Sequence, residues 1–231
     1  MTIRHLLTMT SGLDWDEDLP YADPRNDSSR MEASFDWVRY AIDRPMGQEP
    51  DQAFKYSSGV TQLLSHIFRT ATGHDIEEYA QRHLFTPLGI DRYFWKRAPT
   101  GLVDTEGGLY LTPRDLAKIA YLFVKNGIWD GQPIVQPDWV KQSLAPSVAV
   151  GDGVQYGFKW WLHPYGTGDK RLAWGGSGFG GQRPIFFPDY DLLVVFTGWN
   201  ILPTTPSLAP RIAIERILDA VVDRRGAVPK R

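Results

Sequence analysis

The chain of 231 residues contains no cysteine. This absence excludes disulfide bonds, thiolate nucleophiles and cysteine-ligated zinc, and it leaves the cellular compartment open. No apolar run approaches the roughly 18 residues that a membrane-spanning helix needs. The sequence also lacks a strong excess of either charge, with a net charge of -2, so it offers no basic field to a nucleic acid backbone. We therefore expect neither a membrane span nor a nucleic acid partner.

Several motifs of metal and nucleotide chemistry are absent as well. The five histidines show no metal-ligand spacing such as His-x-x-x-His, which disfavours a histidine metal site. The sequence has no phosphate-binding loop and no Gly-x-Ser-x-Gly nucleophile elbow. We therefore expect no metal and no cofactor.

What the sequence does contain is typical of a globular protein. Hydrophobic residues make up 42% and charged residues 23% of the chain, which excludes a disordered or fibrous protein. Nine Trp, ten Tyr and eleven Phe are many for this length. Such aromatics usually fill a core, and they also line pockets for small organic ligands.

Helix signals recur before residue 150. They cover residues 2–10, 34–42, 59–72, 75–84, 112–126 and 138–144. The start at Thr112-Pro113 is the strongest, since it combines a capping residue with proline at the first helical position. Residues 14–34 form a polar, acidic and turn-rich stretch between two of these helices, and a loop of this length is often functional. A solvated surface loop and a substrate-facing loop remain equally open.

Two of these helices carry specific expectations about their ends and faces. Thr2 is the expected cap of the first helix and Gly12 its expected stop. The spacing of Phe35, Val38 and Ile42 predicts that these three residues lie on one buried face of the second.

After about residue 156 the pattern changes to that of strands. Residues 156–162, 171–174, 182–187 and 192–197 are expected strands, the last two joined by a tight turn at residues 188–191. A closing helix is expected over residues 212–222. The order predicts an α+β fold, with a mostly helical lobe over 1–150 and antiparallel strands with a helix over 151–231. One helix covers only one face of such a sheet, which predicts that a partner layer is missing.

Three hydroxyl side chains gather in Tyr56-Ser57-Ser58, just before the helix at residues 59–72. Either Ser57 or Ser58 is suited to cap that helix. Tyr56 lies just outside the first turn, where it is either buried in the core or directed into a cleft.

Residues 174–182 (WGGSGFGGQ) hold five glycines in nine residues. Such a run permits close approach of the backbone to a ligand or to another element. Exposed N–H groups there could stabilise an oxyanion, and a bulged strand edge or flexible loop is the alternative.

Together these stretches resemble the serine β-lactamase and penicillin-binding-protein superfamily, in its class C-like branch with esterases and 6-aminohexanoate-dimer hydrolases. Residues 2–13 (TIRHLLTMTSGL) resemble the helix that follows the nucleophile helix, and Tyr56-Ser57-Ser58 resembles the Tyr-x-Asn/Ser motif. Residues 107–117 (GGLYLTPRDLA) resemble the GG-x-x-x-T-x-x-D-L-A segment, and residues 174–182 stand where the Lys/His-Thr/Ser-Gly strand belongs. The resemblance implies a β-lactamase/transpeptidase-like fold: an antiparallel sheet flanked by helices, plus a helical lobe, with the site between them.

The resemblance also implies a mechanism, in which a serine of Ser-x-x-Lys forms an acyl-enzyme that water hydrolyses. Tyr56 would be the general base and the acid for the leaving group. A phenol has a reference pKa of about 10, so it needs a nearby cation to act near neutrality. Ser58 would hydrogen-bond the lysine of the nucleophile motif or the substrate amide.

The glycine-rich stretch can be aligned to the family in two registers. Gly176-Ser177-Gly178 matches the strand motif if the Phe179 N–H is the oxyanion donor. A Trp-Gly-Gly variant beginning at Trp174 matches if the N–H of Ser177 is the donor. Neither register contains a lysine, and in the family that lysine helps to hold the carboxylate of β-lactams. The resemblance therefore implies a neutral ester or amide substrate, with β-lactams and D-Ala peptides as the alternative.

No serine of the chain has a lysine three residues further on. In the family the Ser-x-x-Lys motif precedes the TIRHLLTMTSGL-like helix. This sequence begins at that helix, and we expect no signal peptide within it. We therefore expect the N-terminal strands and the nucleophile helix to be absent, and the chain to be the C-terminal portion of a serine hydrolase. It would be inactive alone and could be completed by the missing segment in trans.

Two other interpretations stay open. The chain could be a non-catalytic small-molecule-binding remnant that keeps an aromatic cleft. Alternatively, Ser57, Ser58 or Ser177 could act as an improvised nucleophile, although no base adjoins them in the sequence.

Overall fold

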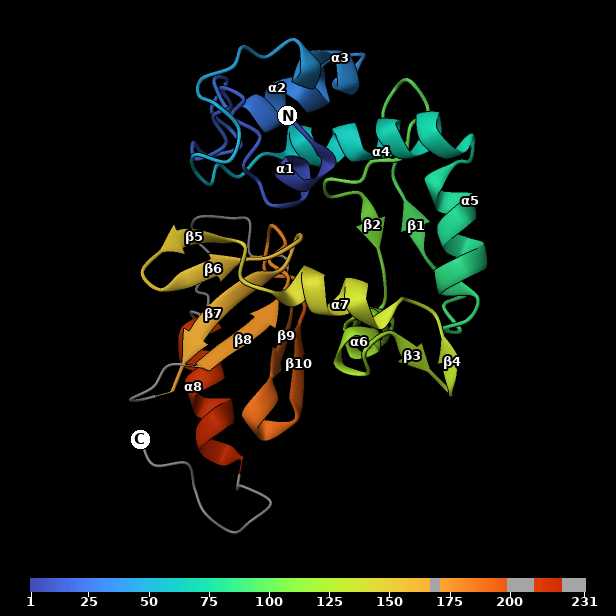
Figure 1. The fold of residues 1–231 in the computed structure, drawn as a ribbon, viewed down its shortest axis with the longest axis vertical. Helices are drawn as coiled ribbons and strands as arrows, with labels where there is room; N and C mark the ends of the chain where they lie inside the picture. Colours follow the sequence, from blue (N-terminus) through green and yellow to red (C-terminus); the bar gives the residue numbers. More distant parts are fainter. Residues whose placement is uncertain (167–170, 199–209, 222–231) are drawn as a thin grey trace.

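A computed structural model describes residues 1–166, 171–198 and 210–221 (Figure 1). All described helices but the last lie within the first 144 residues, above and beside an antiparallel sheet, and the last helix lies behind the sheet. The helices are α1 (Ile3–Leu7), α2 (Asp27–Ala33), α3 (Trp37–Ile42), α4 (Ser58–Thr72), α5 (Ile76–Ala80) continued by a π-helix (Gln81–Phe85), α6 (Pro113–Val124), α7 (Pro137–Leu144) and α8 (Pro210–Ala220). In these described ranges no helix is both long and apolar enough to cross a membrane.

The main sheet has six strands in the order β10-β9-β8-β7-β6-β5, and every neighbouring pair is antiparallel. Its strands are β5 (Val148–Gly151), β6 (Val154–Tyr156), β7 (Trp161–Tyr165), β8 (Arg171–Gly175), β9 (Arg183–Phe187) and β10 (Leu192–Phe196). Two small hairpins pair β1 (Phe94–Trp95) with β2 (Leu109–Tyr110) and β3 (Ile128–Trp129) with β4 (Gln132–Pro133). The expected α+β architecture, with helices flanking an antiparallel sheet, is confirmed.

Both faces of this sheet are covered, although the sequence predicted one covering helix. Ala173 and Ile185 pack on one face against Ile214 and other apolar residues of α8. On the opposite face Trp174 packs among residues of α6, including Phe123. The expectation of a single covering helix is therefore wrong, because α6 also packs on the sheet and covers the face opposite α8.

The strand predicted over residues 156–162 is also wrong, because it is two strands. The chain turns at residues 157–160, between the end of β6 and the start of β7. Gly157 makes this possible, since a Cβ there would stand 2.2 Å from the carbonyl oxygen of Ser143. The sheet accordingly begins at β5, which the sequence did not suggest. The hairpin expected at residues 188–191 is confirmed by the pairing of β9 with β10.

Helix starts agree with their capping signals better than helix ends and faces do. Thr2 caps α1 in a capping box with His5. The helix ends at Leu7 rather than near Gly12, and Met9 takes a left-handed φ of 60°. Residues 14–34 are not loop throughout, because Asn26 caps α2 within them.

The buried face predicted for α3 is wrong for two of its three residues, and only Val38 packs against the core. Phe35 precedes the helix and is 74% exposed, and Ile42 is 56% exposed, whereas Trp37 and Ala41 are buried. The helix starts one turn later than expected, with Asp36 as its cap. Trp37 and Ala41 are the buried residues of α3 in the core shared with α4.

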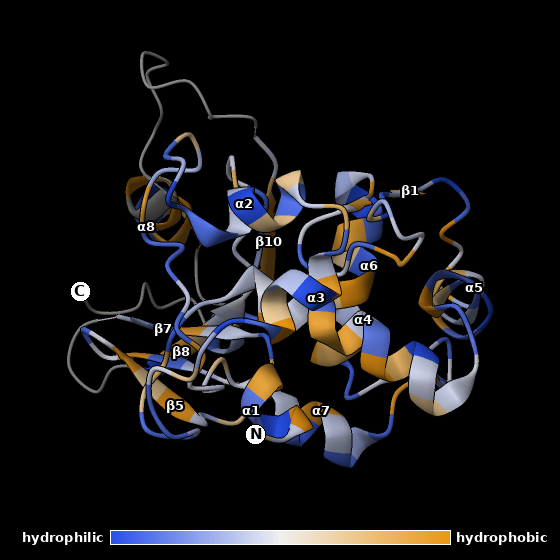
Figure 2. Ribbon diagram, turned by 90° about the horizontal axis from the view of Figure 1, so that it is seen from above, coloured by the Kyte–Doolittle hydropathy of each residue, from blue (hydrophilic) through white to orange (hydrophobic). Residues whose placement is uncertain are grey.

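The core of the helical part is built around α4. Buried side chains from α1, α2, α3 and α4 meet there with Trp15, and Figure 2 shows α3 lying against α4 near the centre of the view from above. Val60 and Leu63 of α4 are both buried in this core. Gly59 gives Trp15 room: a Cβ on Gly59 would stand 2.6 Å from the indole ring.

We expect Gly59→Ala to destabilise the protein by about 1–3 kcal/mol, since overpacking outweighs the gain of helix propensity. Urea denaturation measures the change. Gly107→Ala is the matched control, because no heavy atom lies within 4 Å of a Cβ there, and it should change stability by less than about 0.5 kcal/mol. Wild-type stability of Gly59→Ala would contradict the close packing of Trp15 on α4.

Candidate functional site

The two serines of Tyr56-Ser57-Ser58 have different structural roles at the start of α4. Ser57 has an extended backbone and is the N-cap, with its Oγ accepting from the Val60 N–H at 3.3 Å. Ser58 is then the first helical residue, and its side chain is not needed for capping. The choice that the sequence left open between the two serines is therefore decided in favour of Ser57.

The buried Ser58 is bound by a carboxylate from the loop before α2. Its N–H donates to Glu17 Oε2 at 2.8 Å and its Oγ donates to Glu17 Oε1 at 2.7 Å. Glu17 also accepts from Trp15 Nε1 at 2.8 Å and from the Tyr21 hydroxyl at 3.0 Å. Glu17 thereby joins the loop, the core tryptophan and the first residue of α4. The stretch of residues 14–34 therefore contacts the start of α4 through Glu17.

Tyr56 is stacked on Trp161, with ring centroids 6.0 Å apart and planes at 24°. Burial raises the pKa of Tyr56 to about 12, and the charges of Glu17 and Glu106 add to that increase. The phenol is therefore protonated near neutral pH. It can donate a proton or a hydrogen bond, and a cation beside it would be needed before it could serve as a base.

A second acidic group lies close to Ser58. Burial raises the pKa of Glu106 well above its usual range, and its hydrogen bond with Glu32 and the charge of Asp104 act in the same direction. The neighbouring Ser58 side chain opposes the shift. Lys96 balances part of this charge from the far side, with its Nζ 3.0 Å from Glu32 and 3.4 Å from Asp104. The surroundings of Ser58 are thus rich in carboxyl groups.

The glycine-rich stretch forms the tip of the hairpin between β8 and β9. The Gly176 N–H donates to the carbonyl of Pro184 at 2.9 Å, and the Gly178 N–H donates to the carbonyl of Gln182 at 2.8 Å. Successive N–H groups of an antiparallel strand point to opposite edges, so the N–H of Ser177 faces away from β9. Within the described residues this N–H has no hydrogen-bond partner.

Close approach of the two hairpin arms explains the glycines. A Cβ on Gly175 would stand 2.2 Å from the carbonyl oxygen of Pro184, and one on Gly178 would stand 3.1 Å from the Cβ of Gln182. Gly180 and Gly181 have φ values of 85° and 112°, which close the turn. The stretch is therefore an ordered strand end and turn.

The two aromatic residues of the stretch have different surroundings. Trp174 is buried in the core between α6 and the sheet, and its ring lies 5.0 Å from that of Trp160. Phe179 is exposed at the turn and contacts Tyr21, with ring centroids 4.7 Å apart. Since Tyr21 also bonds Glu17, the hairpin tip and the first turn of α4 are connected through one loop.

The register of the sheet supplies a second connection. Trp161 pairs with Gly175 across β7 and β8, and the same tryptophan stacks on Tyr56. Tyr56 therefore lies over the strand pair that leads into Ser177. The structure brings Tyr56, Ser58 and the hairpin tip to one region, with Phe179 at its margin and Trp174 in the adjoining core.

Sequence reasoning missed four residues of this region: Glu17, Tyr21, Glu106 and Trp161. The length of the polar loop was the only signal for Glu17 and Tyr21. Glu106 directly precedes the glycine pair at 107–108, which marked a motif but not the role of its neighbour. Lys55, the lysine nearest to Tyr56 in sequence, is paired with Asp18 at 3.1 Å.

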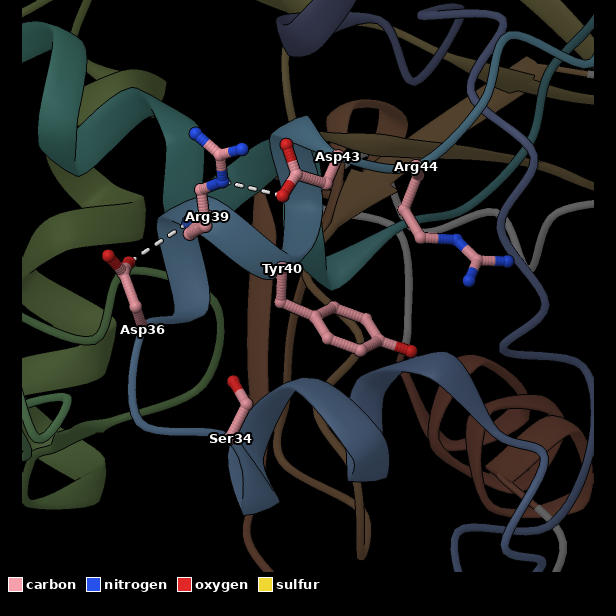
Figure 3. Close-up of a pocket in the computed structure, with 6 residues that line it drawn as sticks. All are labelled: Ser34, Asp36, Arg39, Tyr40, Asp43 and Arg44. Atoms are coloured by element: carbon pink, nitrogen blue, oxygen red, sulfur yellow. Dashed lines mark hydrogen bonds and ion pairs between the residues drawn. The ribbon is translucent and has the colours of Figure 1, made fainter.

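A hollow of about 350 Å³ lies elsewhere, between α2 and α3 (Figure 3). It is lined by Ser34, Asp36, Arg39, Tyr40, Asp43 and Arg44. Its charged groups already have partners, since Arg39 pairs with Asp43 and Arg44 pairs with Asp27. None of the residues predicted from the sequence for the active site lines it. Among the described residues no three His, Cys, Asp or Glu are grouped as metal ligands.

Comparison with solved structures defines the class of this fold. The structure assigned as a 6-aminohexanoate-dimer hydrolase from Bacillus anthracis matches with a TM-score of 0.78 at 19% identity, covering 94% of this chain and 59% of that chain. The penicillin-binding protein from Bacillus halodurans matches with a TM-score of 0.66 at 19% identity, covering 94% of this chain and 72% of that chain. The fold is thus that of the β-lactamases and penicillin-binding proteins.

The sequence comparison is more specific. The family model described as Beta-lactamase matches residues 1–212, and the chain belongs to this family. The 6-aminohexanoate-dimer hydrolase of Paenarthrobacter ureafaciens is 26% identical over 215 residues, covering 84% of this chain. The chain spans 53% of the length of that relative. The resemblance found in the sequence motifs is confirmed.

The charge of Glu17 gives a test of the site's electrostatics. A negative charge disfavours the phenolate, so we expect Glu17→Gln to lower the pKa of Tyr56 below its value of about 12. It should stay above the ordinary 10.0 because burial, the largest cause, remains. The ¹³Cζ resonance of Tyr56, titrated with pH, measures the change. Asp18→Asn is the control and should leave this pKa in place. An unchanged pKa in Glu17→Gln would contradict the electrostatic effect of Glu17 on Tyr56.

Proposed function

We propose that these 231 residues form the tyrosine-bearing part of a β-lactamase-like serine hydrolase, which cleaves ester or amide bonds through an acyl-enzyme. The observation that carries the proposal is the meeting of Tyr56 and Ser58 at the start of α4 with the end of β8. Tyr56 transfers the proton between the nucleophile and the leaving group, and Ser58 orients the partner of that nucleophile. The family match over residues 1–212 supports this assignment.

The nucleophile comes from a Ser-x-x-Lys segment that these residues do not contain, either on the same polypeptide or in trans. The electrostatics of the site are consistent with such a partner. A lysine ammonium beside Tyr56 would lower the raised pKa of the phenol and would compensate the carboxylates around Ser58. Without it the tyrosine has no described group that lowers its pKa.

For the oxyanion we propose the N–H of Ser177, with Trp174 and Gly176 as the residues that hold the strand end. Hydrogen bonds across the hairpin occupy the N–H groups of Gly176 and Gly178, which leaves Ser177 as the donor directed away from β9. The N–H of Phe179, the donor of the other register, lies at the turn two residues further from Tyr56's neighbour Trp161. An oxyanion donor must point to where the charge develops, which favours Ser177.

The substrate we propose is a neutral ester or amide. No lysine or arginine stands in residues 174–182 to pair with a substrate carboxylate. A relative is named as a hydrolase of 6-aminohexanoate dimer, and a small linear amide is one member of the proposed substrate class. β-Lactams and D-Ala peptides are the second class to test.

The first test is acylation of the chain. We expect residues 1–231 alone to form no stoichiometric serine adduct with an activated ester or a fluorophosphonate, as measured by intact-protein mass spectrometry. A chain joined to or mixed with its Ser-x-x-Lys segment should be labelled on the serine of that motif. A stoichiometric adduct on Ser58 of the isolated chain would overturn the proposal and would indicate Glu17 as the base.

The second test concerns Tyr56 in the assembled hydrolase. Tyr56→Phe should lower the acylation rate by about 10²–10⁴-fold, the usual contribution of proton transfer by a positioned side chain. Tyr110→Phe, at an exposed tyrosine of β2, should leave the rate unchanged. Rates with a nitrophenyl ester, an anilide and a chromogenic β-lactam rank the substrate classes, and the β-lactam is expected to be slowest.

A further inference from the structure

The turn between β6 and β7 holds a lysine in an unfavourable position. Lys159 has a φ of 64°, a left-handed conformation that residues other than glycine adopt at a cost. Burial of its ammonium group also lowers the pKa of Lys159 to about 7, although the charge of Glu17 opposes the change. The ion pairs of the described residues do not include this ammonium. Glycine would avoid both the cost of the left-handed backbone and the cost of burying an ammonium group. We therefore look to the contacts of the lysine side chain for its role.

Lys159 reaches from the sheet into the helical part. Its Nζ donates to Thr61 Oγ1 in the first turn of α4 at 2.8 Å and lies 3.5 Å from the sulfur of Met9. Its backbone N–H donates to the carbonyl of Leu7 at the end of α1 at 3.1 Å. The groups facing it from α1 and α4 are thus uncharged, and Glu17 is the charged group that acts on it.

Thr61 connects Lys159 to the segment that contains Tyr56. Its Oγ1 donates to the carbonyl of Ser57 at 3.4 Å, and Ser57 is the residue directly after Tyr56. Two residues after Lys159, Trp161 stacks on the ring of Tyr56. Two sets of contacts therefore join the β6–β7 turn to Tyr56. Trp161 stacks on its ring, and Lys159 is linked to the adjoining backbone through the hydrogen bonds of Thr61.

We propose that the β6–β7 turn sets the position of Tyr56 and that Lys159 is its positioning residue, acting through Thr61 on the carbonyl of Ser57. The inference rests on the proposed function only in giving Tyr56 a chemical task. The hydrogen-bonded link from Lys159 to the Tyr56 turn does not depend on that task. Because the link begins at a titratable amine, a change in its protonation is transmitted to Tyr56.

The experiment follows both groups by NMR in the 231-residue chain labelled at lysine ¹³Cε and tyrosine ¹³Cζ. Lys159→Met and Tyr56→Phe assign the two signals. We expect the Lys159 signal to titrate near pH 7 and the Tyr56 signal to shift with the same midpoint. Thr61→Val should keep the first titration and remove the response of Tyr56. A Tyr56 signal that ignores the Lys159 titration in the wild-type chain would overturn the inference.

Stability gives a second readout that needs no assignment. The unfolded lysine has its ordinary pKa of 10.5 and the folded one a pKa of about 7, so between these values the unfolded state binds the extra proton. Stability must then rise with pH from 7 to about 10 through this group. The urea midpoint of wild type relative to Lys159→Met should therefore increase between pH 7 and pH 9. A constant difference would contradict the buried amine. If Lys159→Met does not fold, Lys159→Gly, which suits the left-handed backbone, replaces it.

Activity of the assembled hydrolase separates this inference from the proposed function. Lys159→Met and Thr61→Val should each lower kcat about tenfold with little change in KM, since misplacement of a catalytic group costs rate, and their double variant should lose no more than either. Loss of activity in Tyr56→Phe with full kcat in Lys159→Met leaves the proposed function standing and overturns the inference. If the Tyr56 signal responds to Lys159 by NMR while Tyr56→Phe is fully active, the inference stands and the proposed function is overturned.

Discussion

The carboxylate of Glu17 is the interaction on which the arrangement of the site depends. It accepts hydrogen bonds from the indole of Trp15, the hydroxyl of Tyr21 and both donors of Ser58. Each donor belongs to a different part of the structure, since Trp15 lies in the helical core, Tyr21 contacts the hairpin tip and Ser58 opens α4. Bonds to a charged acceptor are stronger than neutral ones. One side chain thereby sets where the loop, the helix and the hairpin meet.

The carboxylate of Glu17 also contributes to the negative electrostatic environment of this region. Glu17 and Glu106 both act on Tyr56, whose pKa they raise together with burial. A phenol held protonated among carboxyl groups is suited to a site that receives a cation, because the cation would stabilise the phenolate and the carboxylates at once. The proposed Ser-x-x-Lys lysine meets that requirement. Capping and packing alone explain Ser57, but they do not explain why Ser58 and Tyr56 face acids.

Most errors of the sequence-based predictions concern contacts between distant elements. The helix starts at Thr2, Asp75 and Thr112 were predicted correctly, because a capping residue bonds an N–H two or three positions away. The face of α3 was not, because Trp37 and Ala41, rather than Phe35 and Ile42, pack against the core shared with α4. The tight turn before β7 was hidden as well, because its need for Gly157 comes from the carbonyl of Ser143 on α7.

The sequence by itself determined the family, the α+β class and the hairpin of β9 and β10, and it limited the cap of α4 to Ser57 or Ser58. All of these follow from neighbours along the chain or from ordered motifs. Tertiary structure alone decided which groups surround Tyr56. Glu17 and Ser58 are 41 positions apart and Lys159 and Thr61 are 98 positions apart, and no local pattern specifies such pairs. The tyrosine motif could be recognised from its residues, but its acidic surroundings and the lysine behind it arise only when the sheet packs against the helices.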